Sequence, residues 1–241
     1  MNISIVIPLK NEEGNITNLV QECVTTATEC EAIQHYEIIC VNDGSNDTTA
    51  SILDKLVLVN NSLRIITHKK SYGQSAAIYS GVHSAQHEYI ATLDGDGQND
   101  PADIPLLIDK LADNVGMVTG YRKKRQDNLL RRLASKFANA VRGAILRDNC
   151  PDSACGIKVV CTEIFFSLPF FKSMHRFMPA LVQAAGYDVV HVQVNHRARL
   201  QGETKYTTIG RAMAGLIDLF GVSWLIHRSI IATPPLENTN K

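Results

Sequence analysis

The stretch Tyr89-Ile90-Ala91-Thr92-Leu93-Asp94-Gly95-Asp96-Gly97-Gln98 carries the clearest indication of the fold. Its first half is a short, mostly apolar run bounded by polar residues, which is typical of a buried strand. Its second half brings two carboxylates and an amide, separated by glycines. In an open sheet of parallel strands, ligands bind in the crevice beyond the carboxyl ends of the strands. The sequence therefore predicts that this strand delivers Asp94, Asp96 and Gln98 to such a crevice.

Similar apolar runs lie on both sides of this stretch and alternate with segments that begin like helices. Typical helix starts are Asn11 before two glutamates, Ser45-Asn46-Asp47 before residues 48–59, and Pro101 beside an aspartate. Repeated strand–helix–strand units form a mainly parallel sheet that is covered by helices, so we predict an α/β fold. The expected strands are Ile3 to Ile7, Tyr36 to Val41, Leu63 to Thr67, Tyr89 to Leu93, Val115 to Thr119 and Val189 to Val194.

The second half of the chain shows a weaker alternation. A basic segment from Leu129 to Leu146 and a stretch from Phe177 to Ala185 read as helices, with a cysteine-containing stretch to Cys161 between them. We expect three parts, which are a catalytic domain over residues 1–206, an amphipathic helix over residues 207–231 and a flexible tail over residues 232–241.

The predicted amphipathic helix carries an apolar stripe. Its apolar residues recur at steps of three or four. From Ala212 to Ile226 only Asp218 is charged, but this run is shorter than the about 20 residues that a spanning helix needs. Trp224 beside His227 and Arg228 is typical of a helix that lies on a membrane surface. A helix packed on the domain, or on a second copy in a homo-oligomer, remains the alternative. The stripe consists of Ile209, Met213, Leu216, Phe220 and Trp224.

The composition narrows the class of protein. The chain has 241 residues, of which 45% are hydrophobic, enough for one main domain of an α/β enzyme. Lys and Arg together number 24, as do Asp and Glu, so no overall charge favours a nucleic-acid partner. The start lacks a basic segment and a long apolar run, and the six cysteines form no C-x-x-C pair. We expect a protein at the cytoplasmic face of a membrane, with reduced thiols.

The two carboxylates after the fourth strand predict a metal site. Carboxylate and amide oxygens from Asp96 and Gln98 suit Mg²⁺ or Mn²⁺, which would share its shell with diphosphate oxygens. Such an ion neutralises a departing diphosphate as a sugar is transferred. Gly95 and Gly97 would let the ligand approach the backbone. The alternative is an ordinary turn in which the carboxylates cap backbone amides.

Two further loops follow predicted strands and could bind a nucleotide. Asp43, in the loop Val41 to Ser45, can accept hydrogen bonds from a base or ribose, and the loop Pro8 to Glu12 would touch the same nucleotide. A turn with a helix cap is the alternative for Asp43. Neither G-x-G-x-x-G after the first strand nor G-x-x-x-x-G-K-[ST] occurs, which argues against dinucleotide-dependent oxidoreductases and P-loop proteins.

The motifs together resemble a known family. Ile-Pro-Leu-Lys-Asn-Glu-Glu, Val-Asn-Asp-Gly-Ser, Leu-Asp-Gly-Asp-Gly-Gln and Gly-Glu-Thr-Lys-Tyr follow one another over about 200 residues. In this order they resemble polyprenyl-phosphate glycosyltransferases of family 2, including dolichol-phosphate mannosyltransferases. The resemblance implies a GT-A fold and inverting transfer of a sugar from a nucleotide diphosphate to a polyprenyl or dolichyl phosphate. Mannose from GDP-mannose is the expected donor, and another sugar from a UDP-sugar, delivered to undecaprenyl phosphate or a lipid, is the alternative.

The resemblance also implies roles for individual residues. Asp94, Asp96, Arg122 and Arg199 would be catalytic, and Asp96 with Gln98 would bind the metal. Arg122, Arg131 and Ser135 would hold the acceptor phosphate. Lys10 and Asn42 depart from the usual Tyr and Asp of the family. The donor would be bound by Pro8, Lys10, Glu12, Asp43, Asp94, Gly95, Asp96, Gln98, Arg122, Arg199 and Lys205.

The expected chemistry depends mainly on charge. A phosphate acceptor is already anionic near neutral pH, so it can attack the sugar without a strong general base. Asp152 resembles a family position that orders the acceptor side, and His175 and Arg176 resemble a loop near the sugar. Two rival functions stay open. A sugar nucleotidyltransferase would need a glycine-rich N-terminal phosphate loop, and a non-catalytic nucleotide-sugar-binding protein at a membrane would not need the charged set.

Overall fold

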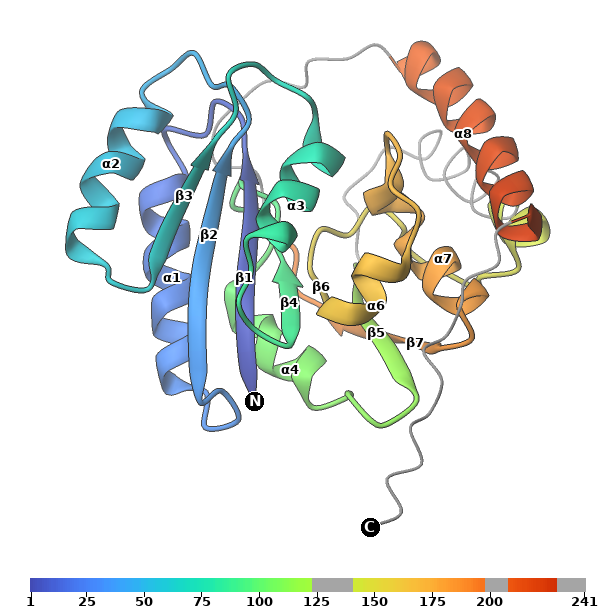
Figure 1. Ribbon diagram of the computed structural model, residues 1–241, viewed down its shortest axis with the longest axis horizontal. Coiled ribbons are helices and arrows are strands. Elements are labelled where there is room, and N and C mark those ends of the chain that lie inside the picture. Colours follow the sequence, from blue (N-terminus) through green and yellow to red (C-terminus); the bar gives the residue numbers. More distant parts are fainter. Residues whose placement is uncertain (123–140, 198–207, 229–241) are drawn as a thin grey trace.

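The α/β architecture is confirmed. A computed structural model of the protein describes residues 1–122, 141–197 and 208–228, with side chains in the last segment from residue 215 onward (Figure 1). Its seven strands form one sheet in the order β3-β2-β1-β4-β6-β5-β7. The strands are β1 (Asn2–Leu9), β2 (His35–Asn42), β3 (Leu63–Thr67), β4 (Tyr89–Thr92), β5 (Val115–Arg122), β6 (Lys158–Cys161) and β7 (Asp188–Val194).

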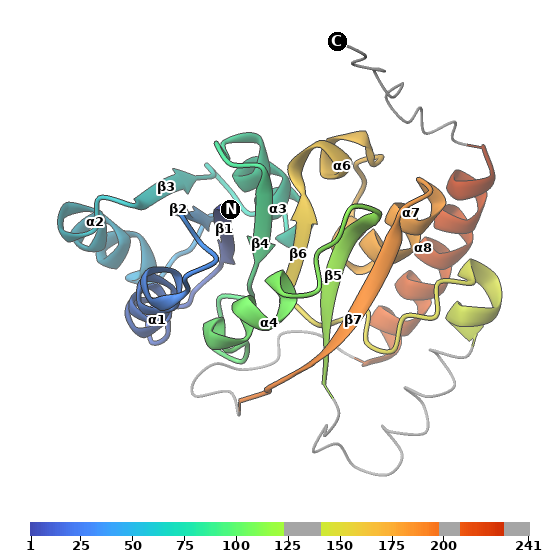
Figure 2. The same ribbon diagram turned by 90° about the horizontal axis from the view of Figure 1, so that it is seen from below.

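Helices cover both faces of the sheet (Figure 2). Alternating residues of β1 divide between two cores, since Ile5 packs with α1, α2 and α4 while Val6 packs with α3, α6, α7 and α8. Each fully buried aliphatic side chain of this kind contributes about 1.5–3 kcal/mol. The helices are α1 (Ile16–Glu29), α2 (Thr49–Val59), α3 (Gln74–His83), α4 (Ile104–Ile108), α6 (Thr162–Ser167), α7 (Met178–Ala184) and α8 (Thr208–Arg228), with short 3-10 helices η1 (Pro101–Asp103) and η2 (Met174–Arg176).

All six strands expected from the sequence are present, and β6 is an addition. It lies antiparallel between β4 and β5, and its residue Lys158 pairs with Thr92 of β4. Its apolar run is only three residues long and starts with a buried lysine, so it lacks the usual signature of an interior strand. The sheet is otherwise parallel, and the carboxyl end of β4 meets the beginning of β6 at one edge.

The first helix begins later than the sequence suggested. Asn11 has a left-handed backbone with φ of 57°, and α1 starts at Ile16. The Asn11 side chain instead exchanges two hydrogen bonds with Asn46, of 2.6 and 2.9 Å. Asn11 is therefore a loop residue that joins the loops after β1 and β2, because its side-chain amide both donates to Asn46 and accepts from it.

Helix α8 has one buried and one exposed apolar face. Leu219 and Val222 are buried against the core of α3, α6 and α7. Leu216, Phe220 and Trp224, which belong to the predicted stripe, are 44%, 65% and 63% exposed. These three residues of the stripe therefore face away from the domain. No helix among the described residues is long and apolar enough to cross a membrane.

Candidate active site

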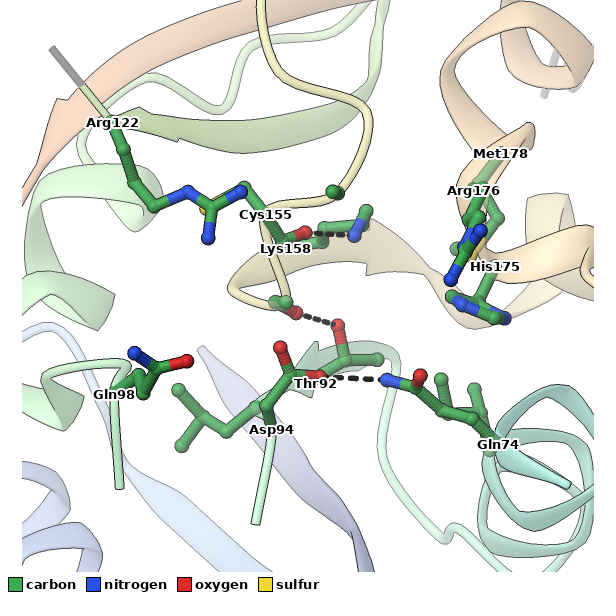
Figure 3. Close-up of a pocket in the computed structure, with 14 residues that line it drawn as sticks. Gln74, Thr92, Asp94, Gln98, Arg122, Cys155, Lys158, His175, Arg176 and Met178 are labelled. Atoms are coloured by element: carbon green, nitrogen blue, oxygen red, sulfur yellow. Dashed lines mark hydrogen bonds between the residues drawn. The ribbon is translucent and has the colours of Figure 1, made fainter. Parts of the chain in front are cut away.

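A cavity of about 200 Å³ lies where β4 and β6 meet (Figure 3). The loop after β4 contributes Asp94 and Gln98, and Arg122 comes from the end of β5. The other walls are formed by the first two turns of α3, by the segment from Ala154 to Lys158 and by η2 with the first residue of α7. The structure thus brings together three residues that the sequence analysis placed in one site.

Asp94 is held in place by its neighbours. Its Oδ1 accepts a hydrogen bond of 2.7 Å from Gln74 Nε2, and its backbone N–H donates to Asn99 Oδ1 at 2.9 Å. Burial raises the pKa of the Asp94 carboxyl, and the nearby charge of Asp96 raises it further, against the opposing effect of Lys158 and Arg122. Two carboxylates that disfavour each other's charge are stabilised by a cation.

The loop after β4 offers part of a metal site. Asp96 Oδ1 accepts from the backbone N–H of Gln98 at 3.2 Å, so the expected turn contact is present beside the carboxylates. No group of three or more His, Cys, Asp or Glu side chains with metal-binding arrangement occurs among the described residues. Two carboxylates and an amide suit Mg²⁺ or Mn²⁺, which retains water or substrate phosphate oxygens for the rest of its shell. The donor set therefore fits the expected ion.

Two glycines around this loop are required by packing. A Cβ on Gly156 would overlap the Asp94 carboxyl group. A Cβ on Gly95 would lie 2.9 Å from the Pro8 carbonyl oxygen, and Gly95 is buried. Close approach of the protein's own chain explains both positions. Contact of Gly95 with a donor stays a prediction.

Arg122 is oriented by Asp152. Arg122 Nε lies 2.6 Å from Asp152 Oδ2, and Nη2 lies 2.9 Å from Oδ1, which is a bidentate pair. Both side chains are nearly buried, with 11% and 7% exposed. Burial alone lowers the pKa of Arg122, but the hydrogen bonds and charge of Asp152 raise that pKa overall. Asp152 therefore fixes the guanidinium at the wall of the cavity.

Asp43 contacts its own chain at both carboxylate oxygens. Oδ1 meets His68 Nδ1 and accepts from the Tyr72 N–H, both at 2.8 Å. Oδ2 accepts from Ser71 Oγ at 2.7 Å and from the Gly73 N–H at 2.8 Å. Burial by itself raises the pKa of Asp43, but these four hydrogen bonds lower it overall. Asp43 organises the loop between β3 and α3, and a direct contact with a base or ribose stays a prediction.

The loops after β1 and β2 lie together as the sequence analysis expected. Lys10 Nζ reaches the Gly44 carbonyl at 3.4 Å, and the Glu12 N–H donates to Thr49 Oγ1 at 2.9 Å. Glu12 Oε2 also accepts from Asn15 Nδ2 at 2.8 Å. These contacts form one continuous edge, although the roles of Pro8, Lys10 and Glu12 in binding a nucleoside stay predictions.

Four predicted basic or polar residues, which are Arg131, Ser135, Arg199 and Lys205, lie outside the described residues. Arg197 is the last residue that the structure describes before Arg199 and Lys205. Its backbone N–H donates to the Gln98 carbonyl at 3.1 Å. Arg197 also pairs with Glu22 and Asp100, each at 2.7 Å. Arg197, the last described residue before residues 198–207, therefore lies beside Gln98.

Three cavity residues, and Ser75 beside one of them, were missed by the sequence analysis or were left without a role. Gln74 and Ser75 begin α3, Lys158 begins β6, and His175 lies in η2. Ser75 Oγ lies 2.7 Å from His175 Nδ1 although the two residues are 100 positions apart. The one signal that the sequence offered for this site was Lys158, a charged residue at the start of the apolar run to Cys161, because a buried charge needs a partner.

Residues 4–168, which are most of the chain, match the family profile described as Glycosyl transferase family 2. The chain belongs to this family. The glycosyltransferase is 34% identical over 232 residues to dodecaprenyl-phosphate galacturonate synthase of Rhizobium johnstonii, an alignment that covers 94% of this chain and 68% of that protein. It is 30% identical over 206 residues to undecaprenyl-phosphate 4-deoxy-4-formamido-L-arabinose transferase of Proteus mirabilis, covering 85% of this chain and 63% of that protein.

The glycosyltransferase also resembles solved structures. Glucosyl-3-phosphoglycerate synthase from Mycobacterium tuberculosis, in complex with Mn²⁺, UDP and glucosyl-3-phosphoglycerate, matches with a TM-score of 0.67. The two chains are 16% identical, and the match covers 93% of this chain and 78% of that chain. This likeness confirms the GT-A fold. The chain spans about two thirds of the length of the two relatives above.

Proposed function

We propose that the protein transfers a sugar, with inversion, from a nucleoside diphosphate to a polyprenyl phosphate. The observation that carries this proposal is the loop from Asp94 to Gln98, which lines a cavity of about 200 Å³ beside Arg122 in a family 2 glycosyltransferase. Both relatives named above bear the name of an enzyme that acts with a polyprenyl phosphate. Their similarity extends over most of this chain, which supports the same acceptor class here.

For the donor, we favour a UDP-sugar over GDP-mannose. The sugars in the relatives' names are galacturonate and 4-deoxy-4-formamido-L-arabinose, and neither is mannose. The solved neighbour binds UDP. These names support the alternative of a UDP-sugar, and they leave the sugar itself to be decided by the residues of the cavity.

The proposed metal is Mg²⁺ or Mn²⁺, held by Asp96 and Gln98 next to Asp94. When bound, the ion supplies positive charge to the departing diphosphate. Gln74 keeps the Asp94 carboxylate in one orientation through its 2.7 Å hydrogen bond. A preorganised carboxylate needs no rearrangement when the donor arrives, which favours catalysis.

Basic side chains would bring two anionic reactants together. Arg122 is presented by Asp152 with its fork in a fixed orientation, and such a fork suits phosphate oxygens. We propose that Arg131 and Ser135 hold the acceptor phosphate, and that Arg199 and Lys205 hold the donor diphosphate. With its charge already present, the acceptor oxygen attacks the sugar without a strong base, so positioning and charge stabilisation supply most of the rate.

Helix α8 is proposed to lie on the membrane that contains the acceptor. Its exposed face carries Leu216, Ile217, Phe220 and Trp224, and its last turn carries His227 and Arg228. An apolar face with an aromatic ring and nearby basic groups suits the boundary between lipid headgroups and acyl chains. The same face could instead bind a second copy of the chain, so membrane binding and oligomeric state need separate measurements.

The deciding experiment measures release of nucleoside diphosphate from UDP-, GDP- and CMP-sugars, with and without undecaprenyl or dolichyl phosphate, in Mg²⁺ or Mn²⁺. We expect lipid-dependent release of UDP from one donor. Asp96→Ala should abolish this release at saturating Mn²⁺, whereas Asp109→Ala, a matched change at an exposed carboxylate, should leave it unchanged. Lipid-independent turnover, or full activity of Asp96→Ala, would contradict the proposal.

A further inference from the structure

The short segment after β7, residues 195–197, is fastened to the chain that follows β4. Asn195 donates its backbone N–H and its side-chain amide to the buried Asp103 carboxylate, at 2.8 and 3.1 Å. Two residues further on, the Arg197 N–H donates to the Gln98 carbonyl at 3.1 Å. Both ends of the segment are therefore held against the loop that carries the proposed metal ligands.

The side-chain amide of Gln98 has one orientation that suits this neighbour. Its Nε2 lies 3.5 Å from the Arg197 carbonyl oxygen. A carbonyl oxygen can only accept a hydrogen bond, so the NH₂ end of the amide faces Arg197 and the oxygen end faces away from it. Figure 3 shows the Gln98 oxygen on the side of Asp94, and both residues line the same cavity. The contact therefore presents Oε1 to the cavity, and oxygen is the ligand atom that Mg²⁺ or Mn²⁺ requires.

The Arg197 side chain anchors the segment from outside the cavity. Nη1 pairs with Glu22 of α1, and Nη2 pairs with Asp100 Oδ1, each at 2.7 Å. The same Asp100 oxygen accepts from the Ala102 N–H at 3.0 Å, where η1 begins. The Arg197 and Glu22 side chains are each 39% exposed. Ion pairs at such positions contribute little to stability, so loss of Arg197 should leave the fold intact.

We propose that Arg197 is a positioning residue for the metal ligand Gln98. Its two ion pairs fix the backbone carbonyl that orients the Gln98 amide, so that Oε1 and not Nε2 faces the ion. This inference rests on the proposed function, in which Gln98 binds Mg²⁺ or Mn²⁺. Removal of the Arg197 charge alone would strengthen the binding of a cation, whereas loss of the amide orientation would weaken it. The direction of the change therefore separates the two roles.

The test measures the Mn²⁺ affinity of the full chain by titration calorimetry with saturating UDP. We expect Arg197→Met to weaken Mn²⁺ binding roughly ten-fold, the low end of the effect of removing a group that orients a metal ligand. Lys110→Met is the matched control, because it breaks an exposed ion pair with Asp109 that lies outside the cavity. This control should leave the Mn²⁺ affinity unchanged.

A second pair of variants tests the orientation of the amide directly. Gln98→Glu ends in two equivalent oxygens, so rotation of the group cannot remove the ligand atom. Arg197→Met combined with Gln98→Glu should therefore bind Mn²⁺ as tightly as Gln98→Glu alone. An equal loss in both backgrounds would show that Arg197 maintains the shape of the loop and not the orientation of the amide, and it would overturn the inference.

Other results would also decide the matter. Unchanged or tighter Mn²⁺ binding by Arg197→Met would overturn the inference. If Arg197→Met does not fold, Glu22→Gln weakens the same bridge and must reduce Mn²⁺ affinity with Gln98 present, but not with Gln98→Glu. Failure of the wild-type chain to bind Mn²⁺ together with UDP would count against the proposed function itself, whereas the variants test the role of Arg197 alone.

Discussion

Arg142 donates a hydrogen bond through Nη1 to the backbone carbonyl of Arg176, at 2.9 Å. Its guanidinium is held from the other side by Asp148 and lies 5.4 Å from the centre of the Phe177 ring. The contact joins the helical residues 141–146 to η2, which carries His175. Arg142 thereby supports the wall of the cavity that η2 forms, without lining the cavity itself.

Loss of Arg142 should destabilise the fold by leaving Asp148 buried without its partner. Asp148 is 1% exposed, and removal of one member of a buried pair costs about 3–5 kcal/mol. We expect Arg142→Met to lower the free energy of unfolding by that amount in urea titrations. Arg142→Met combined with Asp148→Leu should recover most of the loss. Equal stability of the single variant and the wild type would show that the pair has no structural role.

Gly156→Ala should impair activity more than stability. The new Cβ would overlap the Asp94 carboxyl group, which Gln74 holds in place. We expect kcat to fall at least about ten-fold, since misplacement near 1 Å can cost about a hundred-fold. Gly143→Ala is the control, because a Cβ there meets nothing within 4 Å and the residue is helical. That change should stabilise the protein by up to about 1 kcal/mol and leave kcat unaltered.

Asp43→Asn should loosen the loop before α3. An amide offers one acceptor oxygen where the carboxylate offers two, so two of the four donors on the loop lose their partner. We expect a loss of about 1–3 kcal/mol in stability and weaker UDP binding. Asp54→Asn, at an exposed position on α2, should show neither effect. Unchanged stability together with weak UDP binding would instead favour direct contact of Asp43 with the nucleoside.

His175 should make the protein sensitive to mild acid. Its pKa is lowered to about 3 in the folded state, against 6.5 for an unperturbed histidine. The unfolded chain therefore binds an extra proton between pH 6.5 and 3, and the folded state loses stability as pH falls through this range. The expected loss is about 2 kcal/mol at pH 5. His175→Asn should show a smaller loss between pH 7.5 and pH 5 in paired urea titrations.

Polar substitutions on the exposed face of α8 should weaken membrane binding. Phe220→Ser and Trp224→Ser remove apolar surface that would enter the interface, so we expect less protein to float with vesicles that contain anionic lipid. Leu58→Ser is the control, since Leu58 is 82% exposed on α2 and lies outside this face. Unaltered flotation combined with a change from dimer to monomer would assign the face to a second copy.

The sequence predicted the fold well where the pattern of residues is local. Each parallel strand is an apolar run that ends at polar loop residues, and the carboxyl ends of such strands meet at one edge. Asp94, Gln98 and Arg122 therefore converge as expected. The start of α1 was wrong because Asn11 joins two loops instead of capping a helix, a choice that depends on Asn46.

The contacts around His175 and Lys158 could not be predicted from local patterns, although the family resemblance placed His175 and Arg176 in a loop near the sugar. Ser75 and His175 meet only because α3 and η2 pack against each other. Lys158 lies in a strand that is short and antiparallel to its neighbours, so neither its burial nor its place beside β4 is visible in the sequence. Long-range packing decides these contacts, and the nearby residues carry no distinctive spacing.

The pairing of Ser75 from α3 with His175 from η2 joins an early part of the chain to a late one. Residues 1–99 contain the loops proposed to bind the nucleoside and the metal. Lys158, His175 and Arg176, which line the same cavity as Asp94, come from a later stretch that extends past the end of the family profile at residue 168. A change in this later stretch therefore also reaches the loop after β4, because Gly156 packs against the Asp94 carboxyl group.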